Sequence, residues 1–136
     1  YCKELEKEEI LKKESISGVS TYSADRASKK FLIAKRLFNI KLIFESGLLD
    51  YIVKEYFNPV IVLFGSYSKG EDAEDSDIDL YIETPSKKKL NLEKFKKILN
   101  REIQIFQHNN LKDITNHHLA NNIINGITLN NFIEVF

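Results

Sequence analysis

Two aspartates that share one face of an expected strand are the residues of this chain best suited to chemistry. Asp77 and Asp79 alternate with the apolar Ile78 and Leu80, a period of two that predicts a strand with one polar face. Their carboxylates therefore point the same way, about 6.6 Å apart along the backbone. Two such charges repel each other unless a cation or a proton lies between them. The pair is a candidate site for Mg²⁺, which prefers oxygen ligands and usually keeps some water or phosphate.

A turn of small residues lies upstream of the aspartates. The apolar run at residues 60–64 predicts a buried strand that ends at Gly65-Ser66. Gly65 lets a ligand approach the backbone closely, and Ser66 offers a hydroxyl and an N–H at the start of a short helix. Lys69 adds a cation to the same turn. A phosphate-binding turn beside a paired-carboxylate metal site suits a nucleoside triphosphate that carries Mg²⁺ or Mn²⁺.

These two motifs carry a resemblance to a known superfamily. The turn is Gly65-Ser66-Tyr67-Ser68-Lys69-Gly70, and ten residues separate Ser66 from the start of Asp77-Ile78-Asp79. This pattern resembles the signature of DNA polymerase beta-type nucleotidyltransferases, most closely the minimal nucleotidyltransferases of archaea and bacteria. The resemblance implies an α/β (α+β) nucleotidyltransferase fold, a mixed sheet of three to four strands with flanking helices.

The resemblance also implies an activity and a set of site residues. The expected reaction transfers a nucleoside monophosphate from a nucleoside triphosphate, with ATP as the expected donor, to a hydroxyl on a protein or nucleic acid, and releases pyrophosphate. Asp77 and Asp79 would be the catalytic residues and would hold Mg²⁺ or Mn²⁺. Four residues would bind the nucleotide: Gly65, Ser66, Lys69 and Ser76.

The chain departs from the family pattern at the third carboxylate. In the family this group lies on a strand that follows the Asp-x-Asp hairpin, and Gln104 occupies that position here. An amide oxygen can still bind a metal ion, but it carries no charge and is a poor base. Glu102 is expected on the same side of the strand and is a candidate substitute, or a surface residue. A weakened activity is therefore expected.

Whole-chain composition restricts the class of protein. The 136 residues suffice for one domain, and 20 basic and 20 acidic residues cancel, so net charge predicts no nucleic-acid partner. No apolar stretch reaches the length of a membrane span. The single cysteine, Cys2, excludes an internal disulfide and fits a reducing compartment. We expect a cytoplasmic protein without a membrane partner.

Helices and strands around the motifs follow from periodicity and caps. Residues 24–57 are expected to be helical, with a break at Gly47 and an end before Pro59. A further helix is expected over 91–99, then a strand over 102–107 and a final helix from the Asn110 cap to a stop at Gly126. The apolar tail at 127–136 either packs back or joins a partner, and the acidic run at 71–75 predicts a solvated loop. The core side of the first helix is expected to carry Phe31, Ala34, Leu37, Phe38 and Leu42. The first helix is expected to be capped at Asp25 or Ser28, and the helix over 91–99 at Asn91.

The N-terminal segment forms a separate expectation. Residues 1–24 predict a helix end and a short β-hairpin that turns near Ser17-Gly18, and residues 25–136 predict the nucleotidyltransferase domain with its helical linker. The hairpin resembles the tail of the winged helix-turn-helix domain that often precedes archaeal minimal nucleotidyltransferases, and DNA contact is expected only there. A dimerisation arm, which would give a homodimer, is the alternative.

Two other functions stay open from the sequence. The chain could be a catalytically inactive nucleotide-binding module of a winged-helix regulator, with its chemistry lost at Gln104. It could also be the antitoxin of a toxin–antitoxin pair, since some minimal nucleotidyltransferases act in that way.

Overall fold

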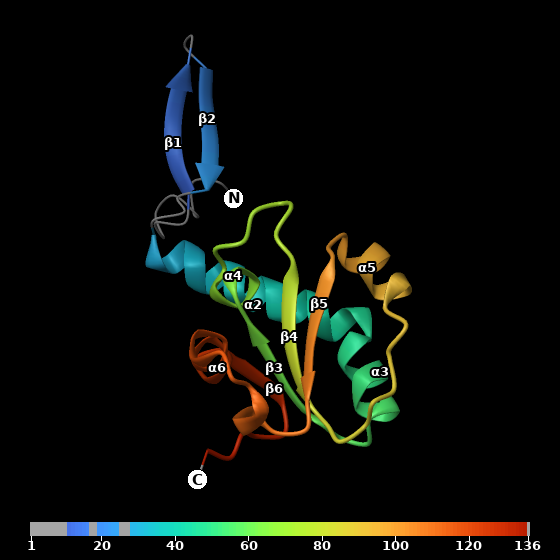
Figure 1. Cartoon of the computed structure of the whole chain (residues 1–136). Coiled ribbons are helices and arrows are strands. Elements are labelled where there is room, and N and C mark those ends of the chain that lie inside the picture. Colours follow the sequence, from blue (N-terminus) through green and yellow to red (C-terminus); the bar gives the residue numbers. More distant parts are fainter. Residues whose placement is uncertain (1–10, 17–18, 25–27, 136) are drawn as a thin grey trace.

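The computed structural model describes residues 11–16, 19–24 and 28–135 (Figure 1). Strands β1 (Leu11–Ile16) and β2 (Val19–Ala24) pair antiparallel, in agreement with the expected hairpin. The helix end expected before this hairpin, its turn at 17–18 and the cap expected at Asp25 lie outside the described residues.

A four-stranded mixed sheet forms the centre of the domain, and its strand order is β5-β4-β3-β6. The two outer strands come from the C-terminal half of the chain. Strand β4 runs parallel to β5 and antiparallel to β3, and β3 runs antiparallel to β6. This arrangement confirms the predicted fold class, because it combines a mixed sheet with flanking helices. The bounds are β3 (Val60–Phe64), β4 (Ile78–Glu83), β5 (Ile103–His108) and β6 (Ile127–Asn130).

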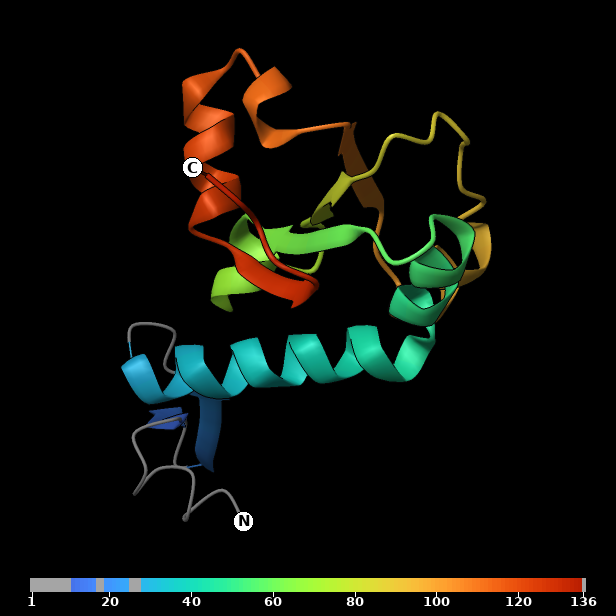
Figure 2. The same ribbon diagram turned by 90° about the horizontal axis from the view of Figure 1, so that it is seen from below.

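Helices cover both faces of this sheet, which gives a three-layered arrangement (Figure 2). Helices α2 (Lys29–Ser46), α3 (Leu48–Glu55) and α5 (Glu93–Leu99) pack on one face, against Ile61 and Leu63 of β3. The 3₁₀ turn η1 (Leu111–Asp113) and α6 (His117–Ile124) pack on the other face, against Val62 and Phe64. Strand β3 is therefore apolar throughout because successive side chains enter two different cores.

The helical segment before the sheet is divided where the sequence predicted. Gly47 lies in the left-handed region, with φ +83° and ψ 4°, and its N–H bonds to the carbonyl of Phe44. This conformation ends α2 and starts α3 because glycine adopts it without steric cost. The hydroxyl of Ser28 accepts the N–H of Phe31 and caps α2, so the expected Ser28 cap is confirmed.

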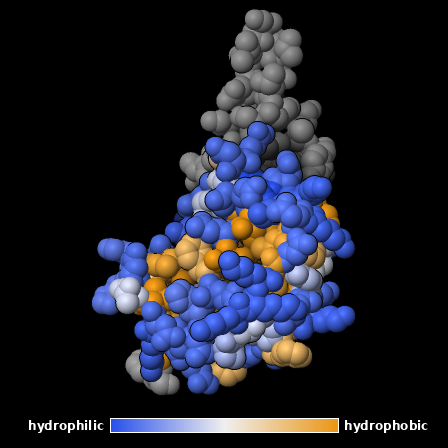
Figure 3. All heavy atoms as spheres, turned by 45° about the vertical axis from the view of Figure 1, so that its right-hand side comes forward, coloured by the Kyte–Doolittle hydropathy of each residue, from blue (hydrophilic) through white to orange (hydrophobic). Residues whose placement is uncertain are grey.

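The predicted core side of α2 was wrong in part. Leu42 is half-buried and packs against the core, but Ala34, Leu37 and Phe38 are exposed. Leu37 and Phe38 are 63% and 52% exposed, whereas Asn39 is 1% exposed and Ile43 is fully buried. The reason is that this part of α2 packs on polar loops as well as on apolar side chains, so an amide is buried in place of a phenylalanine. Hydrophilic side chains surround a smaller group of exposed apolar ones on the face shown in Figure 3.

The C-terminal half contains two further differences from the prediction. The N-cap of α5 is Leu92, one residue later than the predicted Asn91, and the side chain of Asn91 accepts the N–H of Glu93. The single helix expected from Asn110 is divided into two, because Asn110 caps only η1 and Asn116 caps α6. The side chain of each asparagine accepts backbone N–H groups at the start of a helix. At Asn116 these hydrogen bonds start a new helix in place of continuing the first one.

The apolar C-terminal tail packs back onto the domain. Residues Ile127–Asn130 form β6, which pairs with β3. Within the described residues, no helix is long and apolar enough to cross a membrane.

Candidate functional site

The antiparallel pairing of β3 and β4 brings the Gly-Ser turn to the aspartates. Phe64, the last residue of β3, is the register partner of Asp79, so Gly65 lies beside the Asp79 side chain. A Cβ atom built on Gly65 would stand 2.4 Å from Oδ2 of Asp79. Gly65 has φ +80° and ψ −166°, a region that only glycine adopts readily. The carboxylate therefore occupies the space that a side chain at position 65 would take.

The two aspartates interact electrostatically, as their spacing predicted. Burial raises the pKa of the half-buried Asp79 above its ordinary value, and the negative charge of Asp77 raises this pKa further. Asp77 immediately precedes β4 and is exposed. A raised pKa has the sign expected for two carboxylates that face one site. The oxygen donors and their charge fit a small divalent cation such as Mg²⁺.

The Gly-Ser turn leads directly into a short helix. Helix α4 (Ser66–Lys69) is a single turn that starts after Gly65. The hydroxyl of Ser68 donates to the carbonyl of Gly65 at 2.7 Å, and the N–H of Glu71 donates to the carbonyl of Ser66 at 3.0 Å. These bonds fix the backbone of the turn beside the Asp79 carboxylate.

A cavity of about 230 Å³ opens over this turn. Gly65, Ser66 and Lys69 line it, so the structure brings together three of the four residues expected to bind nucleotide. Asn122 and Asn125 of α6 line its other side. Neither asparagine was predicted from the sequence. The local pattern of α6 does not indicate that this helix packs opposite the Gly-Ser turn. Its position depends on the pairing of the following strand, β6, with β3.

A second cavity, of about 420 Å³, lies between α5 and the loop of residues 71–77, which we call the aspartate loop. Asp77 lines it together with Lys96, Arg101 and Glu102. The fourth residue expected to bind nucleotide, Ser76, has its hydroxyl within the loop, where it accepts the N–H of Ala73 at 2.9 Å.

The position of the third carboxylate is occupied by an amide. Gln104 is the direct register partner of Asp79 across the parallel β4–β5 pair, and its side chain is exposed. Glu102 precedes β5, its side chain is 72% exposed, and it pairs with the ammonium of Lys96 at 3.1 Å. Among the residues that the structure describes, no three acidic, histidine or cysteine side chains are grouped as a metal site. The described donors are therefore two carboxylates beside a neutral amide.

The acidic run before the aspartates is only partly solvated. Glu71, Glu74 and Asp75 are exposed, as predicted, but Asp72 is buried. The prediction of a wholly solvated loop was wrong because basic and amide groups from distant parts of the chain surround the Asp72 carboxylate.

A Gly-Ser turn that contacts an Asp-x-Asp strand, at one end of the two central strands of a mixed sheet, is typical of a nucleotidyltransferase domain. The comparison with protein families agrees, and the chain belongs to the nucleotidyltransferase domain family, whose model matches residues 47–122. This match covers more than half of the chain and supports nucleotidyl transfer as the general activity. Comparisons with curated proteins and with solved structures gave no match.

Proposed function

We propose that this chain transfers a nucleoside monophosphate from a nucleoside triphosphate, with ATP as the expected donor, to a hydroxyl group, with release of pyrophosphate. The contact between Gly65 and the Asp79 carboxylate carries this proposal. It places a turn suited to polyphosphate against a carboxylate suited to a divalent cation. The sequence signature further favours a minimal nucleotidyltransferase of the DNA polymerase beta type.

The residues of the site would divide the work between binding and charge stabilisation. Ser66 and the backbone at Gly65 would hold phosphate oxygens, and the exposed Lys69 would balance their charge. Asp77 and Asp79 would hold Mg²⁺ or Mn²⁺. When bound, this ion would neutralise phosphate charge and lower the pKa of the attacking hydroxyl. The protein forms no covalent bond in this scheme, so positioning and electrostatics supply the rate.

The two cavities suggest where donor and acceptor would lie. Asp79 contacts the turn that lines the smaller cavity, while Asp77 lines the larger one. We assign the triphosphate to the smaller cavity and the acceptor hydroxyl to the larger. The aspartate pair would then stand between the two reactants, as in-line transfer requires.

A nucleotide-binding module without catalysis is the second candidate. The observation that favours it is Gln104, whose amide lies in register with Asp79 where the family pattern has a carboxylate. A neutral amide holds a cation less strongly and cannot act as a base at neutral pH.

The test is transfer of label from α-labelled ATP, with Mg²⁺ or Mn²⁺, to components of a cell extract. We expect label transfer by the wild type and its loss in Asp77→Asn and Asp79→Asn. Asp50→Asn is the matched control, because Asp50 is an exposed acid in the first turn of α3, on the opposite sheet face. Metal-dependent ATP binding without transfer, with transfer gained in Gln104→Asp, would establish the second candidate instead.

A further inference from the structure

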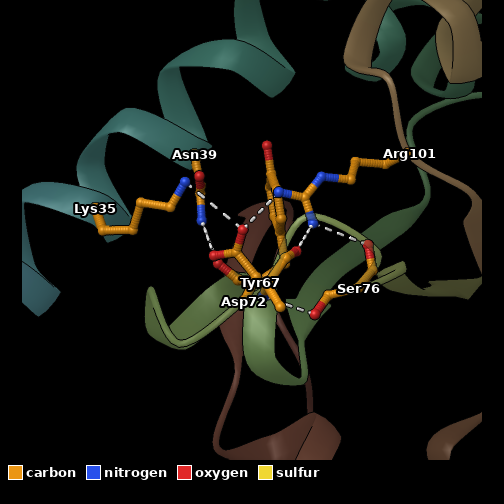
Figure 4. Close-up of polar contacts among 7 residues, drawn as sticks. Lys35, Asn39, Tyr67, Asp72, Ser76 and Arg101 are labelled. Atoms are coloured by element: carbon orange, nitrogen blue, oxygen red, sulfur yellow. Dashed lines mark hydrogen bonds and ion pairs between the residues drawn. The ribbon is translucent and has the colours of Figure 1, made fainter. Parts of the chain in front are cut away.

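A buried carboxylate belongs to the aspartate loop and is held by groups from two other parts of the chain. The side chain of Asp72 has no exposed surface. Its oxygens accept the Asn39 amide at 2.8 Å and the Arg101 guanidinium at 2.9 Å, and the Lys35 ammonium lies at 3.6 Å. Figure 4 shows these side chains converging from α2 and from Arg101, which lies between α5 and β5. We refer to Lys35, Asn39, Asp72 and Arg101 as the Asp72 network.

Arg101 also bonds the backbone of the loop that leads to the metal-binding aspartates. Its Nη1 donates to the carbonyl of Ser76 at 3.1 Å and to the carbonyl of Ala73. Ser76 and Ala73 bond each other as well, N–H to carbonyl at 3.1 Å and N–H to hydroxyl at 2.9 Å. Because Ser76 directly precedes Asp77, Arg101 fixes the backbone one residue before that carboxylate.

The same network holds the Gly-Ser turn. Asn39 donates a second bond from its amide to the carbonyl of Tyr67 at 2.9 Å. The Arg101 guanidinium lies 5.6 Å from the centre of the Tyr67 ring, within the range of a cation–π contact. Arg36 of α2 adds a bond to the carbonyl of Ser68 at 3.1 Å. One set of side chains therefore determines the relative position of α4 and the aspartate loop.

The loop depends on this network because it has little other support. Residues 71–77 form no helix or strand, and most of their side chains are exposed. Burying a carboxylate without hydrogen-bond partners costs much free energy, so Asp72 must stay where its donors are. The donors therefore fix the position of the loop backbone at Asp72. Arg101 supplies several donors from one planar group, which a lysine cannot reproduce.

We propose that Asp72 and Arg101 are positioning residues that hold Asp77 beside Asp79 for divalent-cation binding. This inference rests on the proposed function, since it assigns a cation to that aspartate pair. With Gln104 in place of a third charge, the affinity of the site depends on the placement of two carboxylates. Neither Asp72 nor Arg101 touches the cation or the nucleotide in this scheme.

The first test measures Mn²⁺ binding by electron paramagnetic resonance in the wild type, Arg101→Lys and Asp72→Asn. We expect both variants to bind Mn²⁺ about 10–100-fold more weakly, the usual effect of removing a group that orients a metal ligand. Arg101→Lys keeps a positive charge next to Asp72, so it preserves folding better than an apolar replacement. Ile52→Val, at a fully buried position of α3, is the control for general destabilisation and should bind Mn²⁺ as the wild type does.

The second readout needs no metal. Hydrogen exchange at the Ala73 and Ser76 amides should become faster in Arg101→Lys, while exchange in β3 stays unchanged. Wild-type protein that binds no Mn²⁺ would overturn the proposed function and this inference together. Wild-type protein that binds Mn²⁺ with the same affinity as Arg101→Lys, or unchanged loop exchange, would overturn this inference alone. An equal loss of affinity in Ile52→Val would also overturn it, because the effect would then reflect overall stability.

Discussion

Replacement of Gly65 by alanine tests the contact on which the site depends. Two effects add. The backbone at φ +80° and ψ −166° costs a non-glycine residue roughly 1–3 kcal/mol. The new methyl group would lie 2.4 Å from Oδ2 of Asp79, which forces that carboxylate out of its rotamer at roughly 0.5–1.5 kcal/mol.

The sum predicts a measurable loss of both stability and metal binding. A loss of about 1.5–4.5 kcal/mol corresponds to a decrease in Tm of about 6–18 °C for a domain of this size, at about 4 °C per kcal/mol. The displaced Asp79 should also weaken Mn²⁺ binding. Thermal denaturation followed by circular dichroism and Mn²⁺ titration measure the two effects separately.

Gly47→Ala is the matched control for this experiment. Gly47 also has a positive φ, +83°, but the nearest atom to an added Cβ is Cε1 of Phe95 at 4.0 Å. Only backbone strain of roughly 1–2 kcal/mol is expected there, with no change in Mn²⁺ affinity. In an Asp79→Ala background, Gly65→Ala should lose its steric component and keep its backbone component.

A Gly65→Ala protein that is as stable as Gly47→Ala and binds Mn²⁺ normally would contradict the contact between Gly65 and the Asp79 carboxylate. A Gly65→Ala effect of the same size with and without the Asp79 side chain would also contradict it. In either case, the turn and the carboxylate would not be in contact as the structure has them.

Three further predictions follow from the site and the sheet. Burial, and to a smaller extent the charge of Asp77, raises the pKa of Asp79 in the folded state above its unfolded value. The free energy of unfolding should therefore fall as pH rises from the unfolded pKa to the folded pKa of Asp79. Without metal, Asp79→Asn should have a higher Tm than the wild type at pH 7, and this difference should vanish near pH 3. Saturating Mg²⁺ should stabilise the wild type by about 2.7 kcal/mol at 100 times its Kd and leave Asp79→Asn unchanged, whereas equal shifts would place the cation elsewhere. Tyr81→Phe removes the bond from a buried hydroxyl to Glu83 at 2.8 Å, and urea denaturation should show a loss of about 1.5–3 kcal/mol with unchanged Mn²⁺ binding; a neutral result would mean that water replaces this bond.

Local patterns predicted those features that depend on neighbours in sequence. The period of two in 78–82 and the apolar run at 60–64 predicted β4 and β3. The Gly47 break was visible because glycine is the usual residue in a left-handed position. The spacing of Gly65, Asp77 and Asp79 predicted a shared site, and antiparallel pairing of the two strands brings Gly65 to Asp79.

Features that depend on distant partners were not predictable in this way. Asp72 belongs to an acidic run and seemed solvated, yet its partners Lys35, Asn39 and Arg101 lie far from it in the sequence. The exposure of Leu37 has the same cause. The buried side of α2 is the side that contacts distant residues such as Tyr67 and Asp72, and the apolar pattern of the helix does not identify it. Local propensity cannot report a contact that forms only when the sheet assembles.

The family match begins at residue 47, while α2 ends at Ser46. Three side chains that anchor the turn and the loop, Lys35, Arg36 and Asn39, thus belong to a helix outside the recognisable signature. Strand β6, at Ile127–Asn130, also follows the last matched residue. The elements that support the site therefore extend beyond both ends of the matched stretch. A fragment trimmed to residues 47–122 would leave Asp72 without two of its partners and β3 without one of its neighbours.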